Sequence, residues 1–320
     1  MLVSMKPILD AAREGHYCVP ATNYLNTVQL RKCIEAAEEC NSPLILNIIR
    51  KGTTPTEDLF HALATTSIQF AKEAKVPVAL NLDHGAAFEH IVQAMANGCS
   101  SVMVDRSSLS FEENAAQTKE VVRIAHALGI SVEAEFGHVG TNSETGAKDE
   151  IVIDESGIAK TAITTEEEKR KLYTNPELAV KFVEETGVDC LAVAVGTVHG
   201  LYPEGFKPSL DLELLAELRE KVKVPLVLHG GSGTGEDLLK KAAELGACKL
   251  NVGSDLFKAQ KLAIENLYAD GNKPVFKPLQ DATEIGYEAY KQEVKRYMIM
   301  LGSSGKADYT KQFPDLERFK

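Results

Sequence analysis

Residues 77–105 read PVALNLDHGAAFEHIVQAMANGCSSVMVD, and this stretch decides the fold. It opens with one short apolar run, 77–83, and closes with another, 100–105. Continuous apolar runs of this length are typical of parallel strands buried on both faces. The segment between them ends in Gly98, and glycine is the usual C-terminal cap of a helix that turns back into a sheet. The stretch therefore predicts a strand–helix–strand unit.

The same unit recurs along the chain and gives eight predicted strands. They are expected at residues 18–23, 43–48, 77–83, 100–105, 130–135, 189–195, 225–229 and 247–251. Between them lie segments with apolar residues at helical spacing, such as 27–40 and 111–129. Three more predicted helices end in glycine, at Gly129, Gly187 and Gly246. Eight units favour a closed TIM (β/α)8 barrel over an open doubly wound sheet.

We expect one domain over residues 1–320, because no composition shift or repeat marks a second one. One connection, about 136–175, is too long for a simple turn between barrel elements. Long loops in compact domains are usually lids or binding loops, so we expect an active-site loop here. Residues from about 302 to 320 are predicted to form a polar tail.

Composition excludes several classes of function. The chain has 35 Lys and Arg residues against 46 Asp and Glu residues, a net charge of −11. Nonspecific binding to nucleic acid or to an anionic membrane is therefore not expected. No run of about 18 apolar residues is present to span a bilayer, and the first 15 residues lack the apolar core of a signal peptide. Six scattered cysteines without a CxxC pair fit a reduced, cytoplasmic setting.

Polar residues follow several of the predicted strands, and three of them are histidines. His84, His199 and His229 each come just past a strand and each precede a glycine. In a barrel the carboxyl ends of the strands meet on one rim, so these imidazoles are expected to converge. Three converging imidazoles with an open fourth position form a zinc site typical of catalysis. For one histidine alone, an ordinary rim position would be the better interpretation.

Two carboxylates lie at the same rim. Asp83 precedes His84, and Glu135 ends the fifth predicted strand. Either could orient a metal ligand or act as an acid or base. For Asp83, capping the next helix is the structural alternative.

The last two strands lead into glycine-rich turns. LHGGSG (228–233) precedes a helix that is predicted to start near Glu236, and NVGSD (251–255) follows the eighth strand. Backbone N–H groups at the start of a helix bind anions. In barrels, the loops after strands seven and eight frequently hold a phosphate. The two turns together predict an anion site.

In six segments the chain resembles the class II, zinc-dependent fructose-bisphosphate and tagatose-bisphosphate aldolases, and the similarity runs through nearly the whole chain. The segments are NLDHG (81–85), SSVMVDRS with FEEN (100–114), SVEAEFG (131–137), VDCLAVAVGTVHG (188–200), LVLHGGSG (226–233) and KLNVGSD (249–255). The resemblance implies reversible cleavage of a ketose 1,6-bisphosphate into dihydroxyacetone phosphate and an aldehyde such as glyceraldehyde 3-phosphate. It also implies a role in carbohydrate metabolism such as glycolysis, and a homodimer or homotetramer.

The resemblance also implies roles for individual residues. His84, His199 and His229 would bind the zinc, Asp105 and Glu135 a second or alternative metal, and Asp83 would be the acid/base. Dihydroxyacetone phosphate would be held by Gly200, Gly230, Gly231, Ser232, Asn251, Val252, Gly253 and Ser254, with a monovalent cation (Na⁺ or K⁺) near these loops. Glu144 is our candidate for the mobile carboxylate of the long loop, although the loop's GTNSE differs from the family's usual spacing.

This chemistry agrees with the residue types. Cleavage leaves an enediolate on the ketone fragment, and a zinc ion held by neutral imidazoles can polarise the ketone and stabilise that charge. No lysine Schiff base is then required. Lys249 lies within the eighth predicted strand, and we interpret it as structural or as a rim residue.

The chain departs from the family where the aldehyde end of the substrate would lie. The family's serine after the second strand aligns with Ile49, which Arg50 and Lys51 follow. Arg106 stands where the family has a small residue. These cations could hold the anionic end of another aldehyde, as in a tagatose-bisphosphate or other ketose-1-phosphate aldolase. The alternative is that they are ordinary solvated charges.

Three other functions fit these residues less well. A zinc hydrolase or deaminase on a barrel typically has an HxH pair on its first strand, which is missing here. A non-catalytic descendant would be expected to have lost a ligand or Asp83. A metal-free sugar-phosphate isomerase would leave three rim histidines unexplained.

Overall fold

The structure is a computed structural model that describes residues 1–49, 57–137, 140–141, 151–153, 159–161, 173–199, 209–269 and 278–308. Eight parallel strands close into a barrel in the order β1-β12-β11-β9-β5-β4-β3-β2. Their bounds are β1 Val19–Asn23, β2 Leu44–Ile49, β3 Val78–Gly85, β4 Ser101–Val104, β5 Ser131–Phe136, β9 Cys190–Val193, β11 Leu226–Leu228 and β12 Ala247–Val252. The predicted TIM barrel and its eight strands are confirmed.

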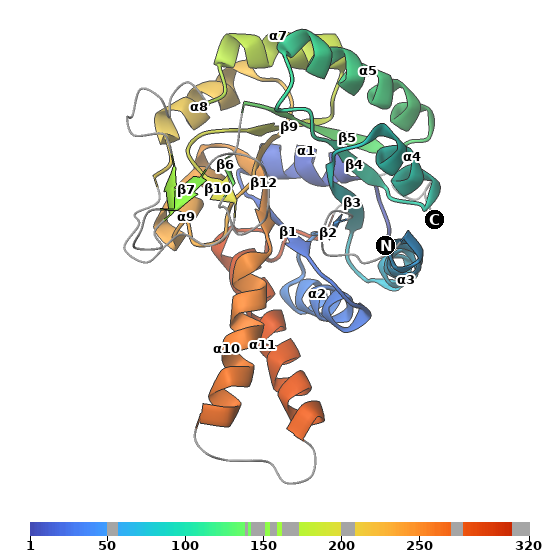
Figure 1. The fold of residues 1–320 in the computed structure, drawn as a ribbon, viewed down its shortest axis with the longest axis vertical. Helices are drawn as coiled ribbons and strands as arrows, with labels where there is room; N and C mark the ends of the chain where they lie inside the picture. Colours follow the sequence, from blue (N-terminus) through green and yellow to red (C-terminus); the bar gives the residue numbers. More distant parts are fainter. Residues whose placement is uncertain are drawn as a thin grey trace.

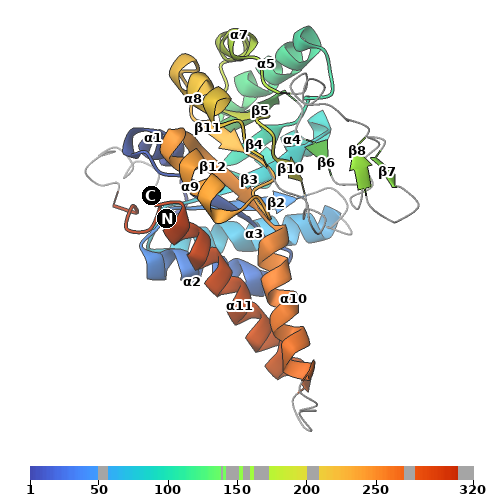
Figure 2. The same ribbon diagram turned by 90° about the vertical axis from the view of Figure 1, so that its left-hand side faces the viewer.

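Helices surround the barrel (Figures 1 and 2). They are α1 Met5–Gly15, α2 Thr27–Cys40, α3 Glu57–Glu73, α4 Phe88–Ala96, α5 Phe111–Ala127, α7 Pro176–Thr186, α8 Leu212–Lys221, α9 Glu236–Leu245, α10 Ser254–Ala269 and α11 Pro278–Met300. Gly98, Gly129, Gly187 and Gly246 all have a positive φ after their helices, as their sequence positions predict. None of the helices in the described part of the chain is long and apolar enough to cross a membrane.

Short strands lie within the predicted long loop, and another one after β9 pairs with one of them. They are β6 Gly140–Thr141, β7 Ile151–Ile153, β8 Ala159–Thr161 and β10 Val198–His199. β6 pairs with β10, and β7 pairs with β8. The rest of the loop up to residue 172 lies largely outside the described residues. At the other end of the chain, the first part of the predicted tail contacts α2, where Gly305 donates its N–H to the carbonyl of Cys40 at 2.9 Å.

The barrel has two separate cores. One lies between the strands and the surrounding helices and contains outward residues such as Leu46, Leu80 and Val132. The other lies inside the barrel, where apolar residues near the strand starts, including Val19 and Ile45, pack against α1. The amphipathic N-terminal helix therefore closes the amino-terminal end of the barrel.

The inward positions become polar toward the carboxyl ends of the strands. On β3, Ala79 belongs to the inner apolar core, whereas the inward residue four positions later is Asp83. Side chains alternate along a strand, so residues two apart share a face. On β3 this change from apolar to polar places Asp83 at the mouth of the barrel where functional groups lie in this fold.

Two helices leave the body of the molecule. α10 and α11 extend side by side away from the barrel, and both views show this projection (Figures 1 and 2). The C-terminal half of α11 packs against α2 and β1. This arrangement brings α11 close to the turn that follows β11.

Candidate active site

The imidazoles of His84 and His229 face each other at the barrel mouth. The Nε2 atom of His84 lies 3.1 Å from the Nδ1 atom of His229, and the two rings are nearly perpendicular. Two ligand atoms of a tetrahedral zinc with Zn–N bonds of about 2.0–2.1 Å lie about 3.3 Å apart. The two nitrogens therefore have the separation that a shared metal ion requires.

The other nitrogen of each ring contacts a carboxylate. His84 Nδ1 lies 2.8 Å from Asp105 Oδ2, and His229 Nε2 lies 2.8 Å from Glu133 Oε1. In a neutral ring, donation of the N–H to that carboxylate leaves the facing nitrogen with its lone pair. Histidines that bind metals usually have such a carboxylate partner, because it fixes the tautomer and the ring orientation.

Two overlapping groups of side chains have the geometry to hold a metal ion. Asp83, His84 and His229 form one group, and His84, Asp105 and Glu135 form the other. In each group the ligand atoms lie within 4.8 Å of one another. The donor set of imidazole and carboxylate suits zinc. The residues present therefore fit the metal that the sequence predicts.

The charges at the mouth favour this fit. Burial alone would lower the pKa of His84, but Asp83, Asp105 and Glu135 outweigh it and raise that pKa to about 9. Burial and the neighbouring His84 lower the pKa of His229. The site thus concentrates negative charge around one imidazole and keeps the other neutral.

The third predicted histidine is described only in part. His199 ends β10, and its backbone is paired with Thr141 of β6. Its side chain lies outside the described residues. The predicted residues Gly200, Glu144, Arg50 and Lys51 lie outside them as well.

Asp83 is buried beside the two imidazoles. Asn23 Nδ2 and Asn251 Nδ2 each donate to one of its carboxylate oxygens at 2.9 Å. Burial would raise the pKa of Asp83, but His84, His229 and Lys249 outweigh burial and hold that pKa below its ordinary value. Asp83 is therefore ionised at neutral pH and can accept a proton. The alternative that it caps the next helix is wrong, since it lies within β3 and the cap position of α4 is Ala87.

A fully buried ion pair lies beneath the imidazoles, and its acidic member was missed from the sequence. Lys249 Nζ lies 2.8 Å from Glu133 Oε2 and donates to Asn251 Oδ1 at 2.6 Å. Burial would raise the pKa of Glu133, but Lys249 and His229 outweigh it and lower that pKa to about 2. The interpretation of Lys249 as structural is supported. The signal for Glu133 was present: a charged residue within an apolar strand, two positions before Glu135.

The predicted anion-binding turns lie side by side at the same mouth. Gly230 and Gly233 have positive φ angles of 69° and 76°. At Gly231 an added Cβ would lie 2.8 Å from the side chain of Leu250 and 2.9 Å from the carbonyl oxygen of Asn251, so only glycine fits. Ser232 is buried beside the turn's backbone. In the neighbouring turn, Val252 ends β12 and Ser254 begins α10. A Cβ added to Gly253 between them would lie 3.0 Å from Asn23 Oδ1.

Arg106 is occupied by contacts within the protein. Its Nη1 atom donates to the carbonyl oxygens of Gly85, Ala86 and Asp105 at 2.7–3.0 Å, and its Nε atom donates to Gln117 at 2.6 Å. The side chain joins the ends of β3 and β4 behind the metal site. These contacts favour a structural role over the substrate-binding role considered from the sequence.

Several aldolases are similar to this chain in sequence and fold. A fructose-bisphosphate aldolase from Thermus caldophilus is 37% identical over 332 aligned positions, which cover 96% of this chain and all of that protein. The crystal structure of the YdjI aldolase from Escherichia coli K12 superposes with a TM-score of 0.79 at 32% identity and covers 96% of this chain and all of the other. A fructose-bisphosphate aldolase from Campylobacter jejuni shares the fold at 24% identity, with a TM-score of 0.75 over 95% of this chain and 97% of that one.

The family model described as fructose-bisphosphate aldolase class-II matches residues 3–306, which includes every element from β1 to α11. The match therefore spans the facing imidazoles, their carboxylate partners and both glycine-rich turns. Together with the barrel and its relatives, this places the chain in the class II, metal-dependent fructose-bisphosphate aldolase family.

Proposed function

We propose that this chain reversibly cleaves a ketose 1,6-bisphosphate into dihydroxyacetone phosphate and an aldehyde such as glyceraldehyde 3-phosphate. One observation carries the proposal: a nitrogen of His84 and a nitrogen of His229 face each other at 3.1 Å. The other nitrogen of each ring lies 2.8 Å from a carboxylate oxygen, of Asp105 for His84 and of Glu133 for His229. Once His84 has lost its proton, this arrangement presents two lone pairs to one divalent ion beside the base Asp83. Relatives with the name fructose-bisphosphate aldolase support the choice of substrate.

The proposed metal is zinc, held by His84 and His229 together with His199, and Asp105 and Glu135 offer an alternative position. When bound, the ion acts as a Lewis acid on the ketone oxygen and stabilises the negative charge that cleavage leaves on the ketone fragment. A monovalent cation near the two glycine-rich turns is part of the same proposal.

Asp83 is the proposed acid/base for the carbon–carbon bond. Its carboxylate accepts the proton of the hydroxyl group on the carbon that becomes the aldehyde, and it returns this proton in the synthetic direction. Asn23 and Asn251 fix both carboxylate oxygens through their amide groups. A second carboxylate must move a proton on the ketone fragment, and Glu144 is proposed for it.

The two turns are proposed to hold the ketone phosphate. Ser232 and the backbone N–H groups around Gly230 and Gly231 lie at the mouth next to His229, and Asn251 and Ser254 lie across from them. Fixed backbone donors suit a phosphate in a protein of net charge −11, because they attract the anion without requiring a basic surface.

The identity of the aldehyde is the main open choice within this proposal. A tagatose bisphosphate or another ketose 1-phosphate would use the same metal and phosphate sites. Arg50 and Lys51 remain candidates for the distal anionic group, whereas Arg106 has its guanidinium engaged by backbone carbonyls. We retain fructose 1,6-bisphosphate as the first choice because of the named relatives.

We also propose a homodimer or homotetramer. Apolar side chains on the projecting helices support it: Leu262 and Tyr268 on α10 and Ile285 on α11 are each more than 40% exposed. A cytoplasmic location is proposed with it, since all six cysteines are buried free thiols. Sedimentation of the purified protein would measure the assembly directly.

Metal removal tests the proposed function. Dialysis against a strong chelator should abolish cleavage of fructose 1,6-bisphosphate, and added zinc should restore it. Borohydride added with substrate should trap nothing, because the buried ammonium of Lys249 is paired with Glu133. Activity that survives chelation, or covalent trapping by borohydride, would instead indicate Schiff-base chemistry.

A further inference from the structure

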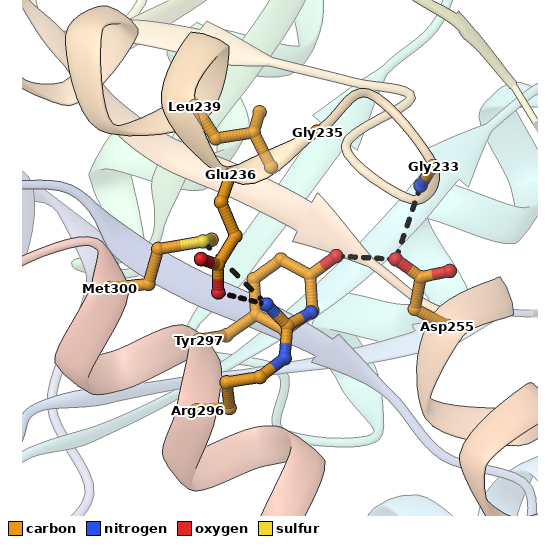
Figure 3. Close-up of a pocket in the computed structure, with 8 residues that line it drawn as sticks. All are labelled: Gly233, Gly235, Glu236, Leu239, Asp255, Arg296, Tyr297 and Met300. Atoms are coloured by element: carbon orange, nitrogen blue, oxygen red, sulfur yellow. Dashed lines mark hydrogen bonds and ion pairs between the residues drawn. The ribbon is translucent and has the colours of Figure 1, made fainter.

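A short chain of hydrogen bonds joins the turn after β11 to α11. The Oδ2 atom of Asp255 accepts the backbone N–H of Gly233 at 3.1 Å and the hydroxyl of Tyr297 at 2.6 Å. Figure 3 shows this carboxylate oxygen between the two donors, which come from the turn and from α11. Asp255 lies in the first turn of α10, so three segments far apart in the sequence meet at one atom.

Packing holds the inner side of this turn at Gly231, whereas Gly233 on its outer side is exposed. Gly230, Gly233 and Gly235 all have positive φ angles, and ordering a glycine costs more backbone conformational entropy than ordering any other residue. A cavity of about 210 Å³ lies behind the turn, lined by Gly233, Asp255 and Tyr297 among others. With open space on that side, the hydrogen bond of Gly233 to Asp255 restrains the outer part of the turn.

A second contact from the same residue holds the buried side chain of Ser232. The backbone N–H of Asp255 donates to Ser232 Oγ at 3.1 Å. Since this oxygen accepts from Asp255, the hydroxyl hydrogen of Ser232 points away from that N–H group and is available to another acceptor. Asp255 thus contacts the turn twice, through its carboxylate at Gly233 and through its backbone N–H at Ser232.

Tyr297 is itself firmly held. Its side chain belongs to the main apolar core, and the guanidinium of Arg296 lies over its ring at 4.7 Å. Burial and the neighbouring Asp255 raise the pKa of the Tyr297 hydroxyl, so the phenol remains the donor in this pair. Arg296 also reaches Glu236, the first residue of α9, at 2.7 Å.

We propose that Tyr297 and Asp255 are positioning residues that hold the turn 229–235 in the shape that binds the substrate's phosphate. The inference rests on the proposed role of that turn in phosphate binding. Neither residue touches the reacting atoms. Both side chains act through Gly233, so their loss should weaken phosphate binding and leave the chemical step unchanged.

The test compares two phenylalanine variants of the same helix in the zinc-loaded enzyme. Tyr297→Phe removes the hydroxyl that donates to Asp255, whereas Tyr287→Phe removes one that lines a separate groove near α2. A hydrogen bond to a charged group supports an expected rise in KM of about 5- to 20-fold for Tyr297→Phe, with kcat within about twofold of wild type. The inhibition constant of inorganic phosphate should rise by the same factor, and Tyr287→Phe should match wild type.

Asp255 provides the complementary variants. Asp255→Ala should reproduce the rise in KM, because it removes the acceptor of both donors. Asp255→Asn retains an acceptor oxygen and should recover most of the loss. A fall in kcat at constant KM in either the Tyr297 or the alanine variant would overturn the positioning role.

Hydrogen exchange supplies a readout that does not depend on activity. In Tyr297→Phe, amides of the segment 229–236 should exchange faster than in Tyr287→Phe, while segments in β3 and β5 remain unchanged. Equal exchange in the two variants would overturn the inference whatever the kinetics show. If the zinc-loaded wild type cleaves no ketose phosphate, the proposed function fails, and the exchange measurement still decides whether Tyr297 holds the turn.

Discussion

The Oε1 atom of Glu133 lies 2.8 Å from the Nε2 atom of His229, and neither side chain is exposed to solvent. The second oxygen of the same carboxylate lies 2.8 Å from Lys249 Nζ. Glu133 therefore has two tasks: it neutralises a buried ammonium group and it orients an imidazole at the proposed metal site. Substitutions can separate these tasks.

Glu133→Gln should lower both stability and metal affinity. The amide leaves the ammonium of Lys249 without its counter-charge, and breaking a buried ion pair from one side typically costs about 3–5 kcal/mol in the free energy of unfolding. Loss of the carboxylate partner of a ligating histidine typically weakens metal binding about 10- to 100-fold. Urea unfolding of the metal-free protein and competition with a chromogenic chelator measure the two effects.

The double variant Glu133→Gln/Lys249→Met is the matched control. It removes both charges, so it should recover much of the lost stability, whereas zinc affinity should stay low. Recovery of both properties together would show that Glu133 acts on the metal site only through the integrity of the barrel.

Asp83→Ala should separate catalysis from metal binding. Without the carboxylate, no group at that position accepts the hydroxyl proton, and loss of a general base commonly lowers turnover about 10²- to 10⁴-fold. Zinc content per chain should remain close to that of wild type. Because Asp83 also lies within a group that could hold a metal, an equal loss of zinc and activity would make it a ligand instead of a base.

Metal affinity should rise with pH across the neutral range. In the metal-free protein the pKa of His84 is raised to about 9, mainly by Asp83 and Asp105 against the effect of burial. Below that pH the imidazole carries a proton that a metal ion must displace, so the apparent binding constant should increase about tenfold per pH unit from pH 6.5 to 8.5. Chelator competition at several pH values measures the slope, and a flat profile would contradict the assignment of His84 as a ligand.

Arg106→Lys should affect stability and not substrate choice. One ammonium cannot reproduce the contacts of Arg106 with three carbonyl oxygens and Gln117. We expect a loss of about 2–3 kcal/mol in the free energy of unfolding. The ratio of kcat/KM for fructose 1,6-bisphosphate, tagatose 1,6-bisphosphate and fructose 1-phosphate should match that of wild type.

The same three substrates test the identity of the aldehyde. Strong preference for fructose 1,6-bisphosphate in the wild type would rule out an unusual aldehyde partner. A preference for another ketose 1-phosphate that Arg50→Ala abolishes would support one. If Arg106→Lys changed the ratio of kcat/KM among the three substrates and left stability unchanged, a substrate-binding role for Arg106 would be supported.

Local sequence was sufficient to predict the strands and helices and the end of the barrel at which the polar residues lie. Apolar runs such as 77–83 and caps such as Gly98 depend only on neighbouring residues, so the eight strands could be predicted before any contact was known. The placement of His84 and His229 on one mouth followed from the parallel direction of the strands. The family resemblance then supplied roles for most of the polar residues there.

The sequence by itself determined the barrel, the end of it that carries the chemistry and the pair of imidazoles that meet there. Only the tertiary structure decided that Glu133 contacts both His229 and Lys249, and that Arg106 joins the ends of β3 and β4. It also decided that Tyr297 reaches the glycine-rich turn after β11 through Asp255. The physical reason is that alternation along a strand fixes which face a side chain takes. Which side chain it meets depends on the stagger of strands and helices around the closed barrel, and no local pattern records that stagger.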